Sequence, residues 1–166
     1  MNRTQGWLIV LGGVLLAAVG DLLWLYPHLP AQIATKFNAA GTAIEWSSKE
    51  GFLAFHVCLL CLLIGMALAG RYLVPLIPPH LVNVPRRDYW LAPERQAFTQ
   101  RRIGELVLGI CTTNLAFVTV LTHLTLRANL ATPPMLGREQ FFVVGGLFVV
   151  FTALIVPEVL FFRRLR

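Results

Sequence analysis

The ionisable side chains that interrupt long apolar stretches of this sequence include Asp21, His56, Glu105 and His123. Ionisable groups inside a bilayer are costly, so they usually pair with one another, relay protons or bind ions. Asp21 and His123 each lie a few residues from the same end of their apolar stretches, so a membrane would hold them at matching depth. We therefore predict an intramembrane polar pair between Asp21 and His123.

A proton or metal site that adds His56 is the functional alternative to this structural pair. No HExxH motif or comparable spacing links the histidines, so we expect no metal and no cofactor. His56 is two positions from Cys58, which places it roughly 160° around a helix from the small residues near Cys58. That angle favours a position toward headgroups or the neighbouring loop, and structural pairing of Asp21 with His123 is the preferred interpretation.

Rows of small and polar residues at helical spacing predict the faces that pack together in lipid. The first apolar stretch has such a row at Gly13, Ala17 and Asp21. The second has a row of small residues: Ala54, Cys58, Cys61, Gly65 and Ala69. The third has the longest row, which mixes polar and small residues: Glu105, Gly109, Thr112, Ala116, Thr119 and His123.

The elements that must position these side chains are four apolar stretches, each near the length of about 20 residues that a membrane-spanning helix needs. Of the 166 residues, 57% are hydrophobic and 13% are charged, whereas soluble domains carry about 25% charged residues. The predicted fold is an all-α integral membrane protein, a single domain over 1–166 with four transmembrane helices in a bundle. The predicted spans are 7–26, 52–73, 103–126 and 140–162.

The distribution of basic residues predicts the orientation of the bundle. Ten lysines and arginines fall on the side that holds both termini and the connection 74–102, and four fall on the side of loop 27–51 and turn 127–139. The excess of basic residues marks the cytoplasmic side, so both termini are predicted to be cytoplasmic. Because orientation accounts for the net charge of +6, no nucleic-acid partner is expected.

A cleaved signal peptide is the alternative interpretation of the first stretch, since Ala18-Val19-Gly20 has the small-x-small pattern of a cleavage site. The apolar residues continue to Tyr26, beyond a typical signal-peptide core. A retained transmembrane helix is therefore preferred.

The loop 27–51 has the composition of an ordered structure rather than a linker. Leu29, Ile33 and Phe37 are four residues apart and predict a short helix, and Asn38 with Gly41 predicts a tight turn. Recognition or loop architecture is the expected role of seven residues: Leu29, Pro30, Phe37, Asn38, Gly41, Trp46 and Lys49.

A second candidate segment lies in the connection 74–102. Aromatic and basic residues next to each other predict an anchor on an anionic leaflet, or a docking site for a cytoplasmic protein. Pro93 suits a first helical turn, so a helix from Pro93 into the third span is expected. The candidate residues are Arg86, Arg87, Asp88, Tyr89 and Trp90.

The loop motif resembles a known family. Leu29-Pro30, an aromatic residue before Asn38, then Gly41, an acidic residue and Ser48-Lys49 are similar to the bacterial membrane domain of unknown function at the N-terminus of SdpI-type toxin-immunity proteins. The stretch 83–95 is similar to one in stand-alone short relatives. The sequence departs from the family pattern at Lys36, where histidine is usual, and at Ala34, where proline is frequent.

The resemblance implies a multi-pass protein of a bacterial inner membrane, with a secreted toxin or a cytoplasmic regulator as possible partners besides the lipid bilayer. No nucleophile elbow, phosphate loop or metal spacing predicts an enzyme. The expected function is a non-enzymatic binding, immunity or sensing module that acts through its outer loop. The alternative is a small proton- or ion-coupled transporter or channel that uses Asp21, His123 and Glu105. The sequence does not define an oligomeric state.

Overall fold

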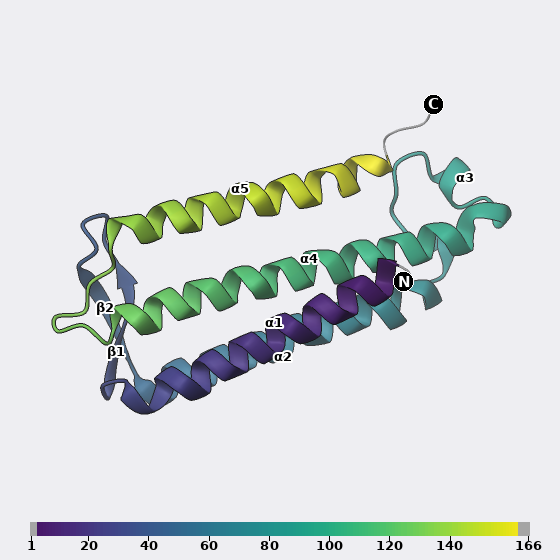
Figure 1. Ribbon diagram of the computed structural model, residues 1–166. Helices are drawn as coiled ribbons and strands as arrows, with labels where there is room; N and C mark the ends of the chain where they lie inside the picture. The colour runs from purple at the N-terminus through teal and green to yellow at the C-terminus, as the bar shows by residue number, and fades with distance from the viewer. Residues whose placement is uncertain (1–2, 163–166) are drawn as a thin grey trace.

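The computed structural model describes residues 3–162, and most of them belong to four long helices (Figure 1). By length and composition, all four of these described helices could cross a membrane. They are α1 (Arg3–Leu25), α2 (Lys49–Tyr72), α4 (Pro93–Ala128) and α5 (Arg138–Phe161). The shorter elements are α3 (Arg87–Trp90) and three 3-10 turns: Tyr26–His28, Val74–Leu76 and Pro79–Leu81.

The longest helix, α4, is the centre of the bundle. Figure 1 shows it between α5 on one side and α1 with α2 on the other, and its contacts with α1 and α2 are the most extensive between helices. At 36 residues it is about 54 Å long, well beyond one membrane crossing. Leucine-rich faces of three helices meet in one buried cluster: Leu11, Ala67, Leu108, Cys111 and Leu115.

Helices α2 and α4 approach each other closely at two glycines. A Cβ added to Gly104 would lie 2.5 Å from the carbonyl oxygen of Gly70, and one added to Gly70 would lie 2.5 Å from Cγ1 of Val107. No side chain larger than hydrogen fits at either position without a shift. This crossing uses small residues in the manner expected for helices in lipid.

The row of small residues predicted the wrong packing face for the second span, and in the first span Asp21 of its row contacts α4 whereas Gly13 does not. A Cβ added to Gly13 or Gly65 would have no neighbouring atom within 4 Å, and Cys58 and Cys61 are exposed. Leucines and alanines on other faces of α1 and α2 fill the contacts with α4 instead. In α4, Thr112 and Thr119 of the predicted row donate to carbonyls of their own helix at 2.7 and 2.8 Å. These two hydroxyls are therefore satisfied without a partner helix.

The chain is not all-α, because a β-hairpin stands where a short helix was predicted. Strands β1 (Gln32–Phe37) and β2 (Ala43–Ser48) pair antiparallel, with bulges on either side of Lys36. The spacing of four between Leu29, Ile33 and Phe37 is an even number, so it also fits one face of a strand. The turn between the strands, with Gly41 at a φ of 82°, fixes the hairpin instead of a helix.

Candidate functional site

Asp21 and His123 come together near the end of the bundle that carries the hairpin, which we call the hairpin end. Asp21 lies in the last turns of α1 and His123 in the last turns of α4, and Asp21 Oδ1 is 2.7 Å from His123 Nδ1. Their side chains are 21% and 41% exposed. With Asp21 ionised, His123 Nδ1 donates the hydrogen bond, which leaves His123 Nε2 for a second partner.

His56 lies on the lining of a small cavity that Asp21 also lines, between α1, α2 and α4. It is half-buried, and its Nδ1 lies 2.8 Å from the carbonyl oxygen of Phe52, to which it donates. Asp21, His56, Thr119 and Thr122 contribute to a cavity of about 20 Å³, enough for one water molecule. His56 occupies this position because the small residues near Cys58 face outward, which turns the opposite side of α2 toward α4.

No three histidine, cysteine or acidic side chains in the described part of the chain converge in a way that could hold a metal ion. Asp21 and His123 form a hydrogen-bonded pair, and His56 lines the water-sized cavity together with Asp21.

A larger groove lies beneath the hairpin, with a volume of about 490 Å³. The hairpin contributes Thr35 and Ser47, and the helices contribute mainly apolar side chains together with His56. A mostly apolar hollow with a few polar groups suits a small amphipathic molecule. The helical side chains that line it are Phe52, Phe55, His56, Leu59, Val118, Leu121, Thr122 and Thr125.

Asn129 holds the hairpin against the helices, a role that the sequence did not predict. It follows the last residue of α4 and is only 3% exposed. Its Oδ1 accepts from the Ala34 amide at 2.7 Å, while its Nδ2 donates to the Ala34 and Thr125 carbonyls at 2.9 and 2.8 Å. An asparagine after a helix is an ordinary capping signal, so nothing in the sequence pointed to this long-range contact.

Asn38 and Gly41, both candidate loop residues, build the turn of the hairpin. Asn38 Oδ1 accepts from the amides of Ala40 and Thr42, both at 2.9 Å. Gly41 has a left-handed backbone and packs against the carbonyl of Leu136. The Leu136 amide donates to the Gly41 carbonyl at 2.9 Å. The amide oxygen of Asn38 is thus used by the loop itself.

Leu29 and Lys49 also serve the loop architecture. Leu29 is buried with Ile33 in the cluster at the base of the hairpin. Lys49 Nζ donates to the Leu29 carbonyl at 3.1 Å and lies 4.5 Å from the centre of the Tyr26 ring. These contacts fix the chain between α1 and β1.

The remaining loop candidates differ in exposure. Phe37 is half-buried, Pro30 is exposed, and Trp46 is 52% exposed. Ile44, which is 50% exposed, is two residues from Trp46 on β2, at the bulge between Ala43 and Glu45. We call Ile44 and Trp46 the hairpin patch.

Trp90, in the other predicted segment, is not an anchor on the membrane surface. It is 7% exposed, its Nε1 donates to the carbonyl of Phe162 at 3.1 Å, and its ring centre lies 5.6 Å from that of the tilted Phe161 ring. The Thr99 hydroxyl donates to the Trp90 carbonyl at 2.7 Å. The segment folds back on the ends of α4 and α5, which buries the ring that was predicted to face lipid.

The other residues of that segment remain at the surface. Arg86, Arg87 and Asp88 are exposed, and Arg86 has a left-handed backbone with a φ of 53°. Tyr89 is 38% exposed and is covered on one side by the Arg95 guanidinium, 4.0 Å from its ring centre. An arginine over an aromatic ring holds this short helix in place.

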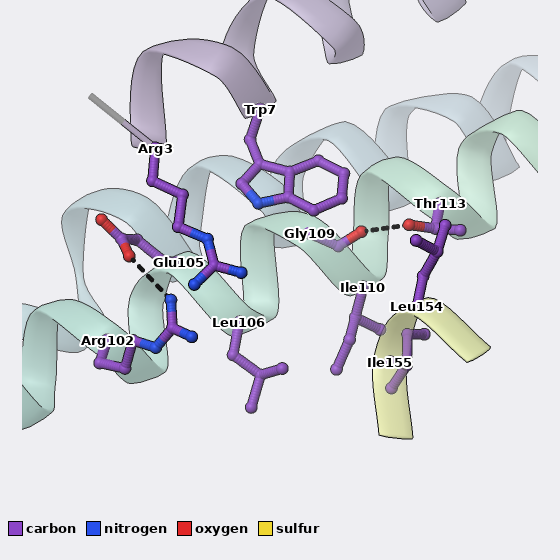
Figure 2. A pocket seen from close by; sticks show the side chains of 10 residues that line it. All are labelled: Arg3, Trp7, Arg102, Glu105, Leu106, Gly109, Ile110, Thr113, Leu154 and Ile155. Carbon is purple, nitrogen blue, oxygen red and sulfur yellow. Dashed lines mark hydrogen bonds and ion pairs between the residues drawn. The ribbon is translucent and has the colours of Figure 1, made fainter. Parts of the chain in front are cut away.

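Glu105 is engaged at the end of the bundle opposite the hairpin, which we call the arginine end. It accepts from the Thr4 hydroxyl at 2.8 Å and lies 3.5 Å from Arg102 Nη1. Figure 2 shows the guanidinium groups of Arg3 and Arg102 beside it, with the Trp7 ring over Gly109. The cavity drawn there holds only about 20 Å³, so this site is a packed ionic cluster.

Comparison with known proteins gives one family. The model of the domain of unknown function DUF1648 matches residues 13–60, which include most of α1, the whole hairpin and the first half of α2. The match confirms the resemblance to a domain of unknown function over this range. Neither a curated protein nor a solved structure matches the chain.

Proposed function

We propose that this chain is a non-enzymatic multi-pass membrane protein whose hairpin is a recognition surface for binding, immunity or sensing. The observation that carries the proposal is a hairpin that is fixed by buried Asn129 yet exposes Trp46 and Ile44 at 52% and 50%. A rigid display of an aromatic and an aliphatic side chain is typical of binding hot spots. The family match over 13–60 includes the whole hairpin.

The proposed orientation places the hairpin outside the cytoplasm, in a bacterial inner membrane. In support, four of the described lysines and arginines lie at the hairpin end and seven at the arginine end. The bacterial inner membrane and the secreted toxin or cytoplasmic regulator as partner come from the resemblance alone.

A sensitivity assay tests the proposal in cells. Deletion of the gene should sensitise cells to a toxin secreted by sibling strains, and the chain with both Ile44→Ser and Trp46→Ser should fail to restore protection. The matched control is Trp24→Ser, because Trp24 is 75% exposed but lies on α1 outside the hairpin. Unchanged sensitivity in the deletion strain would rule out immunity, and full protection by the double variant would rule out the hairpin as its surface.

A small proton-coupled transporter is the second candidate, favoured by the Asp21–His123 contact beside a cavity of water size. Against it stands the buried cluster that separates this pair from Glu105, including Leu108, Cys111 and Leu115. Reconstituted vesicles loaded with a pH-sensitive dye decide the question. A transporter requires proton flux that Asp21→Asn reduces, and vesicles without flux would exclude it.

A further inference from the structure

A second hollow, separate from the hairpin groove, opens at the arginine end. The first turn of α1, the last turn of α2 and the first third of α4 surround a volume of about 460 Å³. We call it the arginine pocket. Its lining contains two arginines, one carboxylate, two neutral polar side chains and two small apolar ones: Thr4, Arg71, Pro75, Ala97, Gln100, Arg101 and Glu105.

Arg71 has an unsatisfied donor in this pocket. Its Nε is buried and has no hydrogen-bond partner among the described residues. The guanidinium carbon lies 5.3 Å from the centre of the Tyr72 ring, which supports its plane from one side. Buried donors without partners are rare, and they require an explanation such as a ligand. The planar set of donors on arginine matches the oxygens of a phosphate.

The charges around the pocket do not cancel. Glu105 is the one carboxylate in its lining, and it is already bound by Thr4 at 2.8 Å and Arg102 at 3.5 Å. In the described part of the chain, neither Arg71 nor Arg101 forms an ion pair. Two unneutralised guanidinium groups therefore face the same hollow.

An apolar border of exposed side chains adjoins Pro75 of the pocket along the chain. Leu73 and Leu76 flank Pro75 and are 59% and 76% exposed, and Tyr72 is 58% exposed. They lie at the end of a helical stretch that could cross a membrane, Lys49–Leu76. Tyrosine at this depth is typical of the membrane–water interface, and leucines beside it suit acyl chains. This border favours a lipid over a soluble anion.

We propose that the arginine pocket binds the headgroup of an anionic phospholipid, with the phosphate oxygens accepting from Arg71 and Arg101. Thr4 and Gln100 form polar walls, and Gln100 is held in place by donating to the carbonyl of Ile77. The acyl chains lie along Leu73 and Leu76. Basic pockets between membrane helices are known to take phosphate-bearing headgroups in this way.

The test is lipid binding to the purified full chain in detergent, followed by native mass spectrometry. Phosphatidylglycerol and phosphatidylcholine are titrated separately, and inorganic phosphate is the third ligand. Phosphatidylglycerol should bind the parent chain more tightly than phosphatidylcholine. The double variant Arg71→Gln/Arg101→Gln should lose affinity for it roughly tenfold, as expected when charge-assisted hydrogen bonds are removed.

Three further variants keep the result interpretable. Arg101→Gln alone changes an exposed side chain, so it should fold normally and still lose part of the affinity. Arg71→Lys retains the charge but not the Nε donor, so it should bind less well than the parent. Arg127→Gln is the matched control, because Arg127 is exposed on the same helix at the hairpin end.

Two results would overturn the assignment. Equal phosphatidylglycerol affinity in the parent chain and in folded Arg101→Gln and Arg71→Lys would show that these arginines do not bind the lipid. Inorganic phosphate that binds the parent chain and displaces the lipid at equal concentration would instead identify a site for a soluble anion.

Discussion

The hairpin and the arginine pocket satisfy their polar groups in different ways. The chain itself supplies the partners that hold the hairpin and the intramembrane pair, since Asn129 bonds Ala34 and Asp21 lies 2.7 Å from His123. One buried acceptor near the hairpin, Oε1 of Gln140 in the first turn of α5, has no partner among the described residues. In the arginine pocket, Nε of Arg71 is buried and donates to no described residue. Arg101 forms no ion pair with any described residue.

This difference shows how one bundle can combine a surface that its own residues hold in shape with a pocket whose polar groups depend on a bound ligand. Polar groups that are satisfied internally hold a shape without help from the surroundings, so the hairpin can present the same patch to any partner. Groups that lack partners gain stability only from what surrounds them. We therefore expect the hairpin end to respond to mutation of its own residues, and the arginine end to respond to the lipid.

Asn129→Ala is the change with the largest expected effect on stability. It removes a buried side chain that makes three hydrogen bonds and leaves the amide and carbonyl of Ala34 without their partner. The expected loss is about 2 to 4 kcal/mol in the free energy of unfolding, measured by thermal or denaturant unfolding in detergent. Limited proteolysis should then cut within the hairpin.

Asn83→Ala is the control for this prediction, since Asn83 is exposed in the connection at the other end of the bundle. It should change stability by less than about 0.5 kcal/mol. If Asn129→Ala were as stable as Asn83→Ala, and its hairpin as resistant to protease, the description of the hairpin end as internally fixed would be wrong.

Gly104→Ala is expected to have the next largest effect, this time at the arginine end. The added methyl group would overlap the carbonyl oxygen of Gly70 and force α2 away from α4, at a cost of about 1 to 3 kcal/mol. Because Arg71 follows Gly70 directly, the variant should also bind phosphatidylglycerol less well. Thermal unfolding with and without lipid measures both effects.

Gly65→Ala is the matched control, because a Cβ there would meet no atom within 4 Å. It should leave the melting temperature unchanged or raise it slightly, since alanine favours helix more than glycine by about 1 kcal/mol. Equal melting temperatures for Gly104→Ala and Gly65→Ala would contradict the close crossing of α2 and α4.

The sequence predicts best what depends on distance along a helix. Four long apolar stretches give four helices, and their ends set the depth of each polar group, which is why Asp21 and His123 could be matched across 102 positions. Pro93 likewise indicated the start of α4. These inferences need only the rise per residue and the preference of lipid for apolar side chains.

The sequence predicts poorly what depends on rotation of a helix or on contacts between distant segments. Small residues mark close helix contacts at Gly70, Gly104 and Gly109, whereas a Cβ added to Gly13 or Gly65 would meet no atom within 4 Å. A spacing of four fits both a helix and a strand, so the hairpin was missed. The burial of Trp90 depends on residues 72 positions away, and local composition does not indicate such a contact.

Loss of the Asp21–His123 contact should lower stability less than Asn129→Ala or Gly104→Ala does. Asp21→Asn and His123→Ala should each lower stability, and the double variant should lose less than the sum, with a coupling of about 1 kcal/mol. The contact is partly exposed, which limits its strength. A double-mutant cycle by thermal unfolding measures the coupling, and additive losses would show that the two side chains do not stabilise each other.

Trp46→Ser should have the smallest effect on stability. It therefore tests whether Trp46 binds a partner or helps to hold the hairpin in place. The side chain is 52% exposed, and the contacts that hold the hairpin involve other residues, chiefly Asn38 and Asn129. The free energy of unfolding should change by no more than about 0.5 kcal/mol. If unfolding in detergent instead showed a loss of stability comparable to that of Asn129→Ala, Trp46 would contribute to the hairpin structure. The hairpin would then not be a surface whose exposed side chains are free for a partner. A neutral result, together with lost protection in cells by the hairpin-patch variant, would mean that the cost of exposing this ring to water is offset only when a partner covers it.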